Sequence, residues 1–121
     1  MTHVNISRGE IWRVKFPFQE DLLKGKIRPC LILGWSESGK QNDQKVWLMP
    51  FFSFEEGGSP KENDIYISNF KKFNLTEGSY LRTARIASVD FNLVKDGSYV
   101  GEVDQEIIDI AYNAIANNLI R

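Results

Sequence analysis

Side chains that form crosslinks or bind transition metals are scarce in this sequence. Its 121 residues include one cysteine, Cys30, and one histidine, His3. A single cysteine excludes an intramolecular disulfide, and no apolar segment follows a basic start, so we expect a protein of the reducing cytoplasm. A metal site would have to be built from carboxylates, and no cluster of them suggests one. We therefore expect no metal and no cofactor.

Long hydrophobic runs and an excess of one charge are also missing. The longest apolar runs, Pro29–Gly34 and Val46–Phe52, are far shorter than the ~20 residues that span a bilayer, so we expect no membrane contact. The 15 basic and 16 acidic side chains leave a net charge of −1, so a nucleic-acid site would need local clustering of charge. The length predicts a single domain over residues 1–121.

The apolar residues that are present follow strand-like patterns. Trp12, Val14 and Phe16 alternate with charged residues, which predicts a half-buried strand. The nearly continuous apolar run after Pro29 predicts a strand buried on both sides. Pro50 removes a ladder donor from a third strand, which predicts an edge or bulge and strong bending. The predicted strands are Glu10–Phe16, Pro29–Trp35, Lys45–Phe54, Asp64–Ser68, Leu81–Val89 and Phe91–Val100, the last with a fold-back at Asp96-Gly97.

Only the C-terminal segment has helical spacing. Asp104 is a good N-cap, and Glu106 in the first turn favours the helix dipole. The apolar residues of the predicted helical face are Ile107, Ile108, Ile110, Ala111, Ala114, Ile115 and Leu119. Several strands followed by one amphipathic helix predict a mostly β protein with α, namely a small, strongly bent β-barrel capped by its C-terminal helix.

Function is expected in the connections, because the strands of a small barrel are occupied with packing. Residues 18–27 switch from acidic to basic: Glu20 and Asp21 come first, and Lys24 and Lys26 precede Arg28. A second connection, 55–63, is polar and rich in glycine.

Four segments in order carry a family resemblance. Arg8-Gly9-Glu10-Ile11-Trp12 is followed after a polar loop by Ile27-Arg28-Pro29-Cys30, then by Val46–Ser53 with its internal proline, and then by Leu81–Asp90. The chain resembles the PemK/MazF family of toxin endoribonucleases, also called mRNA interferases, over about residues 7–119. The resemblance implies an SH3-like barrel of the CcdB/MazF type. It also implies a homodimeric growth inhibitor from a type II toxin-antitoxin system that cuts single-stranded RNA without metal. An antitoxin with a disordered tail in the RNA groove would neutralise it.

The implied chemistry is attack of a ribose 2′-OH on the adjacent phosphate, which needs a base, positive charge at phosphorus and an acid for the leaving oxygen. The resemblance makes Arg28 a phosphate clamp, and the alternative is an arginine paired at the surface with Glu20 or Asp21. Arg82 matches a family arginine that serves as proton donor or second phosphate ligand. Because arginine keeps its proton in water, we expect electrostatic stabilisation from Arg82.

The remaining candidates have weaker arguments. Ser53 matches a family hydroxyl that could bind phosphate or the 2′-OH, although a serine after a strand also caps turns. Three basic side chains would follow the RNA backbone or form a solvated face: Lys24, Lys26 and Arg85. Three aromatic side chains would stack on bases or pack in the core: Phe18, Trp35 and Phe52.

Two positions depart from the family pattern. Ala84 stands where members often carry an aspartate base, and Phe52 replaces the threonine before Ser53. Glu20 and Asp21 then remain as candidate bases. A second function therefore stays open, a non-catalytic protein of the same fold that binds nucleic acid or a protein. A topoisomerase poison of a related fold is a third idea, but it would be expected to end in an aromatic-containing tail, whereas this sequence ends in Asn118-Leu119-Ile120-Arg121.

Overall fold

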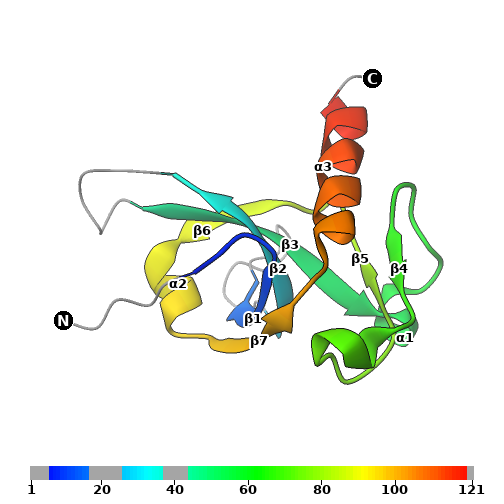
Figure 1. Ribbon diagram of the computed structural model, residues 1–121, viewed down its shortest axis with the longest axis horizontal. Helices are drawn as coiled ribbons and strands as arrows, with labels where there is room; N and C mark the ends of the chain where they lie inside the picture. Colours follow the sequence, from blue (N-terminus) through cyan, green and yellow to red (C-terminus); the bar gives the residue numbers. More distant parts are fainter. Residues whose placement is uncertain (1–5, 17–25, 37–43, 120–121) are drawn as a thin grey trace.

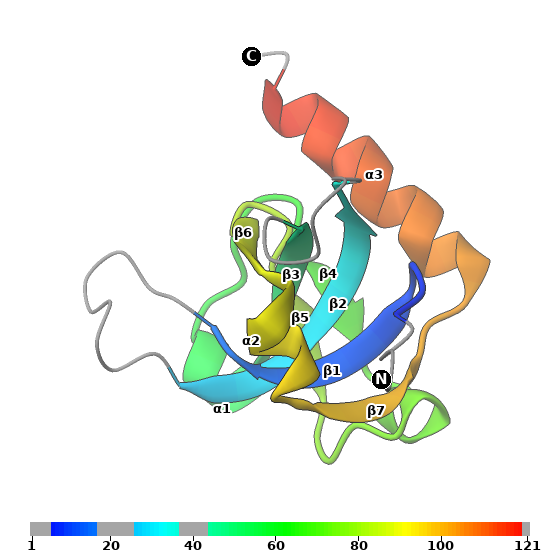
Figure 2. The ribbon, with the colours of Figure 1, turned by 90° about the vertical axis from the view of Figure 1, so that its left-hand side faces the viewer.

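The computed structural model describes residues 6–16, 26–36 and 44–119. Within these ranges an antiparallel sheet precedes the C-terminal helix α3 (Gln105–Leu119). The order across the sheet is β4 (Ile65–Ile67), β5 (Ser79–Leu81), β3 (Lys45–Ser53), β2 (Ile27–Trp35), β1 (Glu10–Lys15) and β7 (Ser98–Glu102). A further strand, β6 (Ala87–Asp90), pairs with β3 outside this path. The sheet curls into a half-barrel with α3 along one side (Figures 1 and 2), which confirms the predicted mostly β fold.

Strand β3 is the centre of the sheet and changes partner along one edge. On that edge, residues 45–48 pair with β6 and residues 51–53 pair with β5. Pro50 lies between the two pairings, and its carbonyl accepts the backbone N–H of Arg82 at 3.0 Å. The nitrogen and carbonyl of a strand residue point to the same side, so the donor that proline lacks faces the gap between β5 and β6. The edge or bulge predicted at Pro50 is observed as a break between two ladders along one side of a central strand.

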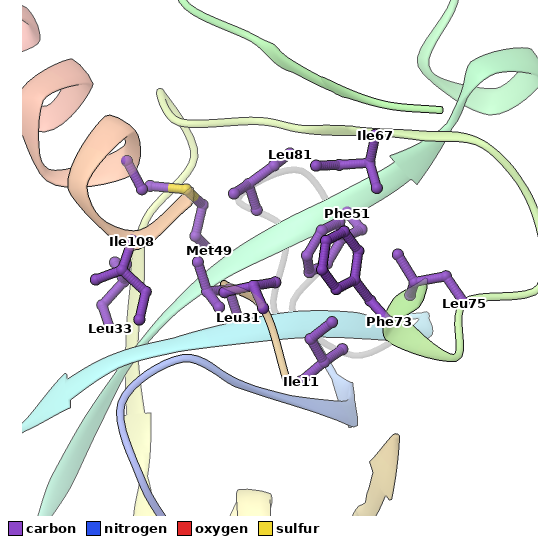
Figure 3. Close-up of a cluster of buried hydrophobic side chains, with 12 residues drawn as sticks. Ile11, Leu31, Leu33, Met49, Phe51, Ile67, Phe73, Leu75, Leu81 and Ile108 are labelled. Atoms are coloured by element: carbon purple, nitrogen blue, oxygen red, sulfur yellow. The ribbon is translucent and has the colours of Figure 1, made fainter. Parts of the chain in front are cut away.

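Strands β1, β2 and β3 contribute buried side chains to both faces of the sheet, and the described residues form two hydrophobic clusters. The main core lies between the sheet, α3 and the short helix η2 (Phe70–Phe73), and Figure 3 shows Ile108 of α3 beside Leu33 and Met49. The second core lies on the other face, where α2 (Phe91–Lys95) contributes the fully buried Val94. The two-sided burial predicted for Pro29–Trp35 is confirmed by the near-zero exposure of Cys30, Leu31, Ile32 and Leu33.

The single strand predicted over Leu81–Val89 is wrong. Strand β5 ends at Leu81 and β6 begins at Ala87, with a turn between them. Two hydrogen bonds hold this turn. The Thr83 hydroxyl donates to the carbonyl of the distant Asn63 at 2.9 Å, and within the turn the N–H of Arg85 donates to the carbonyl of Arg82 at 3.1 Å. Arg82 and Ala84 therefore lie in a connection and do not alternate along a strand.

The strand predicted over Phe91–Val100 is also wrong in its first half, where α2 forms before β7 begins at Ser98. The chain does fold back at Gly97, which lies so close to β1 that a Cβ there would come 2.2 Å from the carbonyl oxygen of Arg13. Smaller differences concern element ends: β2 starts at Ile27, and Phe54 belongs to the helix α1 (Phe54–Gly57).

The predicted face of α3 needs one correction. Ile108, Ala111 and Ala114 are buried, and Ile107 and Ile115 pack beside them, but Ile110 is 43% exposed and lies outside the buried face. The side chain of Leu119 lies outside the described part of the chain. Helix α3 begins directly after Asp104 as predicted, although the Asp104 carboxylate accepts a hydrogen bond from Lys72 Nζ at 2.6 Å.

The close approach at Gly97 predicts a stability effect. We expect Gly97→Ala to lower the free energy of unfolding by about 1–3 kcal/mol, because the added methyl group must push the Arg13 backbone away. Ser98→Ala, at the exposed neighbouring position, should change it by less than about 0.5 kcal/mol. Urea denaturation of both variants measures the difference, and equal midpoints would contradict the prediction.

Candidate functional site

An arginine of strand β2 and an arginine that follows strand β5 meet at one aromatic ring. Arg28 is the second residue of β2, and Arg82 follows the last residue of β5. Their guanidinium carbons lie 4.2 and 4.9 Å from the ring centroid of Phe52, which is on β3 between these two strands. Both distances are within cation–π range. The pairing of β3 with β2 and β5 therefore unites two arginines that are more than 50 residues apart in the sequence.

Arg28 is 4% exposed and is held by a carboxylate in a two-bond fork. Its Nη1 donates to Oε1 of Glu56 at 2.7 Å, and its Nη2 donates to Oε2 at 3.1 Å. Lys26 Nζ also donates to Oε2 of Glu56, at 3.3 Å. The partner of Arg28 is thus Glu56 of α1, whereas Glu20 and Asp21, the partners that the sequence suggested, lie outside the described residues.

Arg82 has the same kind of partner. Its Nε and Nη2 donate to the two carboxylate oxygens of Asp64 at 3.2 and 2.9 Å, and Nη2 also donates to the carbonyl of Gly57 at 3.3 Å. The Asp64 side chain is 1% exposed, so the charge of this buried arginine is compensated. In both pairs the carboxylate occupies the fork with which arginine binds phosphate oxygens.

Two hollows border the arginines. A polar cavity of about 150 Å³ beside Arg28 is lined by Lys26, Ser53, Glu56, Glu77 and Ser79 among others. A wider hollow of about 490 Å³ beside Arg82 is lined by Lys61, Glu62, Ala84, Arg85 and Asn118. The first brings together three residues predicted from the sequence, Arg28, Ser53 and Lys26, and the second brings together Arg82, Ala84 and Arg85.

The other predicted site residues are placed as follows. Ser53 is the N-cap of α1, and its hydroxyl oxygen accepts the Glu56 N–H at 3.1 Å, which leaves its O–H able to donate. Phe52 is only 8% exposed. Trp35 borders an apolar groove of α3. Four predicted residues lie outside the described part of the chain, so their positions are untested: Lys24, Glu20, Asp21 and Phe18.

The electrostatics of the cavity depend on Glu56. Hydrogen bonds and charge from Arg28, and secondly from Lys26, lower the pKa of the Glu56 carboxyl, so it is ionised at neutral pH. Burial raises the pKa of the Cys30 thiol, so this residue of the second core stays protonated and is no nucleophile.

Sequence reasoning missed both carboxylate partners. Ser53 and Glu56 have the spacing of a capping box, which could have placed the start of a helix there. No local pattern connects Glu56 to Arg28 or Asp64 to Arg82, because the members of each pair meet only in the folded sheet.

The described ranges contain no group of three or more His, Cys, Asp or Glu residues that could hold a metal ion. Nor is any helix in the described part of the chain long and apolar enough to cross a membrane.

The lowered pKa of Glu56 predicts how stability depends on pH. Ionised Glu56 stabilises the folded state above its ordinary pKa of 4.5, and this contribution is lost as the pH falls through the lower folded-state value. The difference in unfolding free energy between wild type and Glu56→Gln should therefore shrink as the pH falls from about 6 to about 3. Glu55→Gln, on the same helix, controls for the loss of a carboxylate. A difference that is constant across this range would refute the coupling to Arg28.

Comparison with known proteins identifies the fold and the family. The family described as PemK-like, MazF-like toxin of type II toxin-antitoxin system matches residues 7–119. MazF (Form-I) from Deinococcus radiodurans has a TM-score of 0.70 at 14% identity and covers 97% of this chain and 98% of its own. Toxin MazF-mt6 of Mycobacterium tuberculosis has a TM-score of 0.66 at 15% identity, with 91% and 95% covered.

A mycobacterial endoribonuclease in complex with its cognate antitoxin has a TM-score of 0.65 at 17% identity, with 95% of each chain covered. A search of curated proteins gives no match. The structural likenesses, all below 20% identity, show the fold, and the family match extends over nearly the whole chain. The chain belongs to the PemK-like, MazF-like toxins of type II toxin-antitoxin systems.

Proposed function

We propose that this chain is an endoribonuclease that acts in the cytoplasm and cleaves single-stranded RNA without a metal ion, by attack of a ribose 2′-OH on the adjacent phosphate. The observation that carries the proposal is the convergence of Arg28 and Arg82 at the Phe52 ring, next to a polar cavity that also contains Ser53 and Lys26. Membership in a toxin family and the likeness to an endoribonuclease support it.

The proposed role of both arginines is to stabilise the charge that develops on the phosphate. A planar guanidinium can hold two phosphate oxygens at once, and its proton is too tightly bound for general-acid work. Glu56 is about one-third exposed, whereas Asp64 is fully buried. A phosphate can therefore replace the carboxylate of Glu56 more easily than that of Asp64. This assigns Arg28 to direct contact with the reacting phosphate and makes Arg82 the more rigid second ligand.

The roles of the other candidate residues are assigned from their positions in the structure and along the chain. Ser53 is proposed to donate a hydrogen bond to a phosphate oxygen or the 2′-OH from the rim of the cavity. Lys24, Lys26 and Arg85 are proposed to follow the RNA backbone. Since Ala84 supplies no carboxylate, Glu20 or Asp21 of the loop before β2 is proposed as the base that takes the 2′-OH proton.

A second partner is proposed from the family and from relatives. Two solved structures of similar fold are complexes with antitoxins, one of them MazE-MazF from Deinococcus radiodurans. We propose that a cognate antitoxin binds this chain and competes with RNA for the arginine pair. Such competition needs acidic groups on the antitoxin, because Arg28 and Arg82 already bind carboxylates.

A homodimer is proposed from an exposed apolar surface. A groove of about 360 Å³ between α3 and the ends of β2 and β3 is lined by Leu33, Trp35, Trp47, Ile86, Tyr112 and Ile115. Trp47 and Ile86 are each 40% exposed, which is unusual for large apolar side chains on adjacent elements. A second copy of the chain covering this groove would bury them.

One observation favours the alternative function, a binding protein of the same fold that does not cleave RNA. Ala84 lies on the hollow beside Arg82, where a carboxylate base would be useful, and both described arginine forks are occupied by carboxylates. Nucleic acid would then bind by replacing a carboxylate at an arginine, and no base would be present to take the 2′-OH proton.

The nuclease proposal predicts cleavage of single-stranded RNA in excess EDTA, with a 2′,3′-cyclic phosphate product and no cleavage of DNA. Arg28→Ala should lower the rate about 10²- to 10³-fold, because one transition-state donor is lost. Arg28→Lys, which keeps the charge but not the fork, should also be slow, and Lys15→Ala on the exposed side of β1 should cut normally. A folded Arg28→Ala protein that cuts at the wild-type rate refutes the role of Arg28. Complete loss of cleavage in EDTA refutes the metal-free mechanism.

The dimer proposal predicts sedimentation as a dimer at tens of micromolar, an order-of-magnitude concentration for a stable interface. Trp47→Glu should shift the protein to monomer, since it places a charge in the apolar groove, while the exposed Tyr99→Glu on β7 should not. Wild-type protein that is monomeric at this concentration contradicts the proposal.

A further inference from the structure

Aromatic residues form a row across three neighbouring strands next to the arginine pair. Phe52 of β3 is directly opposite Tyr80 of β5, and Tyr80 is directly opposite Tyr66 of β4. Directly opposite residues lie on the same face of a sheet, so the three rings share one face. Phe54, the first residue of α1, adds a fourth ring. The row extends from the arginines to the edge strand β4, at the end of the sheet that also holds α1 (Figure 1).

The outer three rings, Phe54, Tyr66 and Tyr80, form what we call the aromatic platform. Their centroids are 4.9 Å apart for Phe54 and Tyr80, 5.1 Å for Tyr66 and Tyr80, and 5.9 Å for Phe54 and Tyr66. These are typical distances for packed aromatic pairs. Tyr66 is nevertheless 59% exposed and Phe54 is 37% exposed, while Tyr80 is buried beneath them. The platform therefore offers ring surface to a ligand and is supported from below.

Two glycines fix the platform against the backbone. A Cβ on Gly57 would come 2.7 Å from the Tyr80 ring, and a Cβ on Gly78 would come 2.5 Å from the Phe54 ring. Only glycine allows rings to lie this close to the chain. The Tyr80 hydroxyl also donates to the carbonyl of Gly58 at 3.2 Å. Phe54 and Tyr80 are thus held in place before any ligand binds, which lowers the entropic cost of binding.

The platform adjoins the proposed phosphate ligand. The guanidinium carbon of Arg82 lies 5.7 Å from the Tyr80 centroid and 4.9 Å from the Phe52 centroid, so Arg82 is the member of the arginine pair that contacts the platform. A positive group beside exposed rings matches the two parts of a nucleotide, an anionic phosphate and a flat base. Phe52 itself is 8% exposed and has two guanidinium groups at its ring, so it offers little surface for stacking.

We propose that Tyr66 and Phe54 form a stacking site for an unpaired base of single-stranded RNA, next to the phosphate that Arg82 holds. This inference rests on the proposed RNA-cleaving function and adds a residue pair that selects unpaired over base-paired RNA. A base within a duplex cannot reach the platform, because its faces are covered by neighbouring base pairs.

The test uses RNA that cannot be cleaved, so that binding is measured without activity. The probes are a 2′-O-methyl oligouridine of about ten nucleotides and an abasic sugar-phosphate chain of the same length. Fluorescence anisotropy over a range of salt concentrations compares wild type with four variants: Tyr66→Ala, Tyr66→Phe, Tyr99→Ala and Arg82→Ala. Tyr99 is the matched control, because it is 54% exposed and lies on β7 at the opposite end of the sheet order.

If a base stacks on the platform, the variants should differ in their affinity for the two probes. Tyr66→Ala should weaken binding of oligouridine by about 5- to 150-fold and leave binding of the abasic chain unchanged. Tyr66→Phe and Tyr99→Ala should bind like wild type. The salt dependence should keep its slope in Tyr66→Ala, because no phosphate contact is lost, whereas Arg82→Ala should reduce the slope by about one.

Three results would overturn the inference, and they are distinguishable from failure of the proposed function. If Tyr66→Ala binds oligouridine like wild type and Arg82→Ala has a reduced salt slope, the phosphate site is supported and the stacking site is refuted. An equal loss for the abasic chain shows that the effect of Tyr66 does not come from a base. Loss of antitoxin binding alone in Tyr66→Ala assigns the platform to a protein partner. If wild type binds neither probe, the RNA-binding function fails together with the stacking site.

Discussion

The pairing of strand β3 with three other strands is the constraint on which the site depends. One edge of β3 pairs with β2, and the other pairs with β6 and then, beyond Pro50, with β5. Because proline cannot donate to the ladder, the second edge is interrupted there, and the chain between β5 and β6 is free to form a turn. This turn places Arg82 beside Phe52 and opposite Asp64. If β5 and β6 formed one continuous strand, Arg82 would be part of its ladder with β3 and would lie away from Asp64.

Burial of two arginines determines much of the surrounding chemistry. Removing a guanidinium from water is costly unless its charge and its donors are satisfied, so Glu56 and Asp64 are needed for folding regardless of the reaction. The two pairs differ in solvent access, since Glu56 is partly exposed and Asp64 is not. In the proposed function, an anion therefore replaces the partner of Arg28 more easily than the partner of Arg82. Such an arrangement suits binding of a charged ligand that must also be released.

The two ends of strand β3 carry different kinds of surface. The arginine pair and the aromatic platform lie near its last residues, next to β5, β4 and α1 (Figure 1), whereas Trp47 near its start borders the apolar groove at α3. This division follows the two ladders of β3, which pairs with β6 before Pro50 and with β5 after it. A charged ligand and an apolar partner can thus be bound without competing for the same residues.

The amino-acid sequence by itself determined the β1, β2, β3 and β4 strands to within one or two residues, the start of α3 after Asp104, the interruption at Pro50 and the family. These features depend on alternation, on caps and on the missing donor of proline, which are local properties of the chain. Only the tertiary structure decided that residues 82–86 form a turn and that Phe91–Lys95 is helical. It also decided that Glu56 and Asp64 bind the two arginines and that Tyr66 packs against Tyr80. The physical reason is distance along the chain: the partners Arg28 and Glu56, Arg82 and Asp64, and Tyr66 and Tyr80 are 14 to 28 residues apart and meet only in the folded sheet.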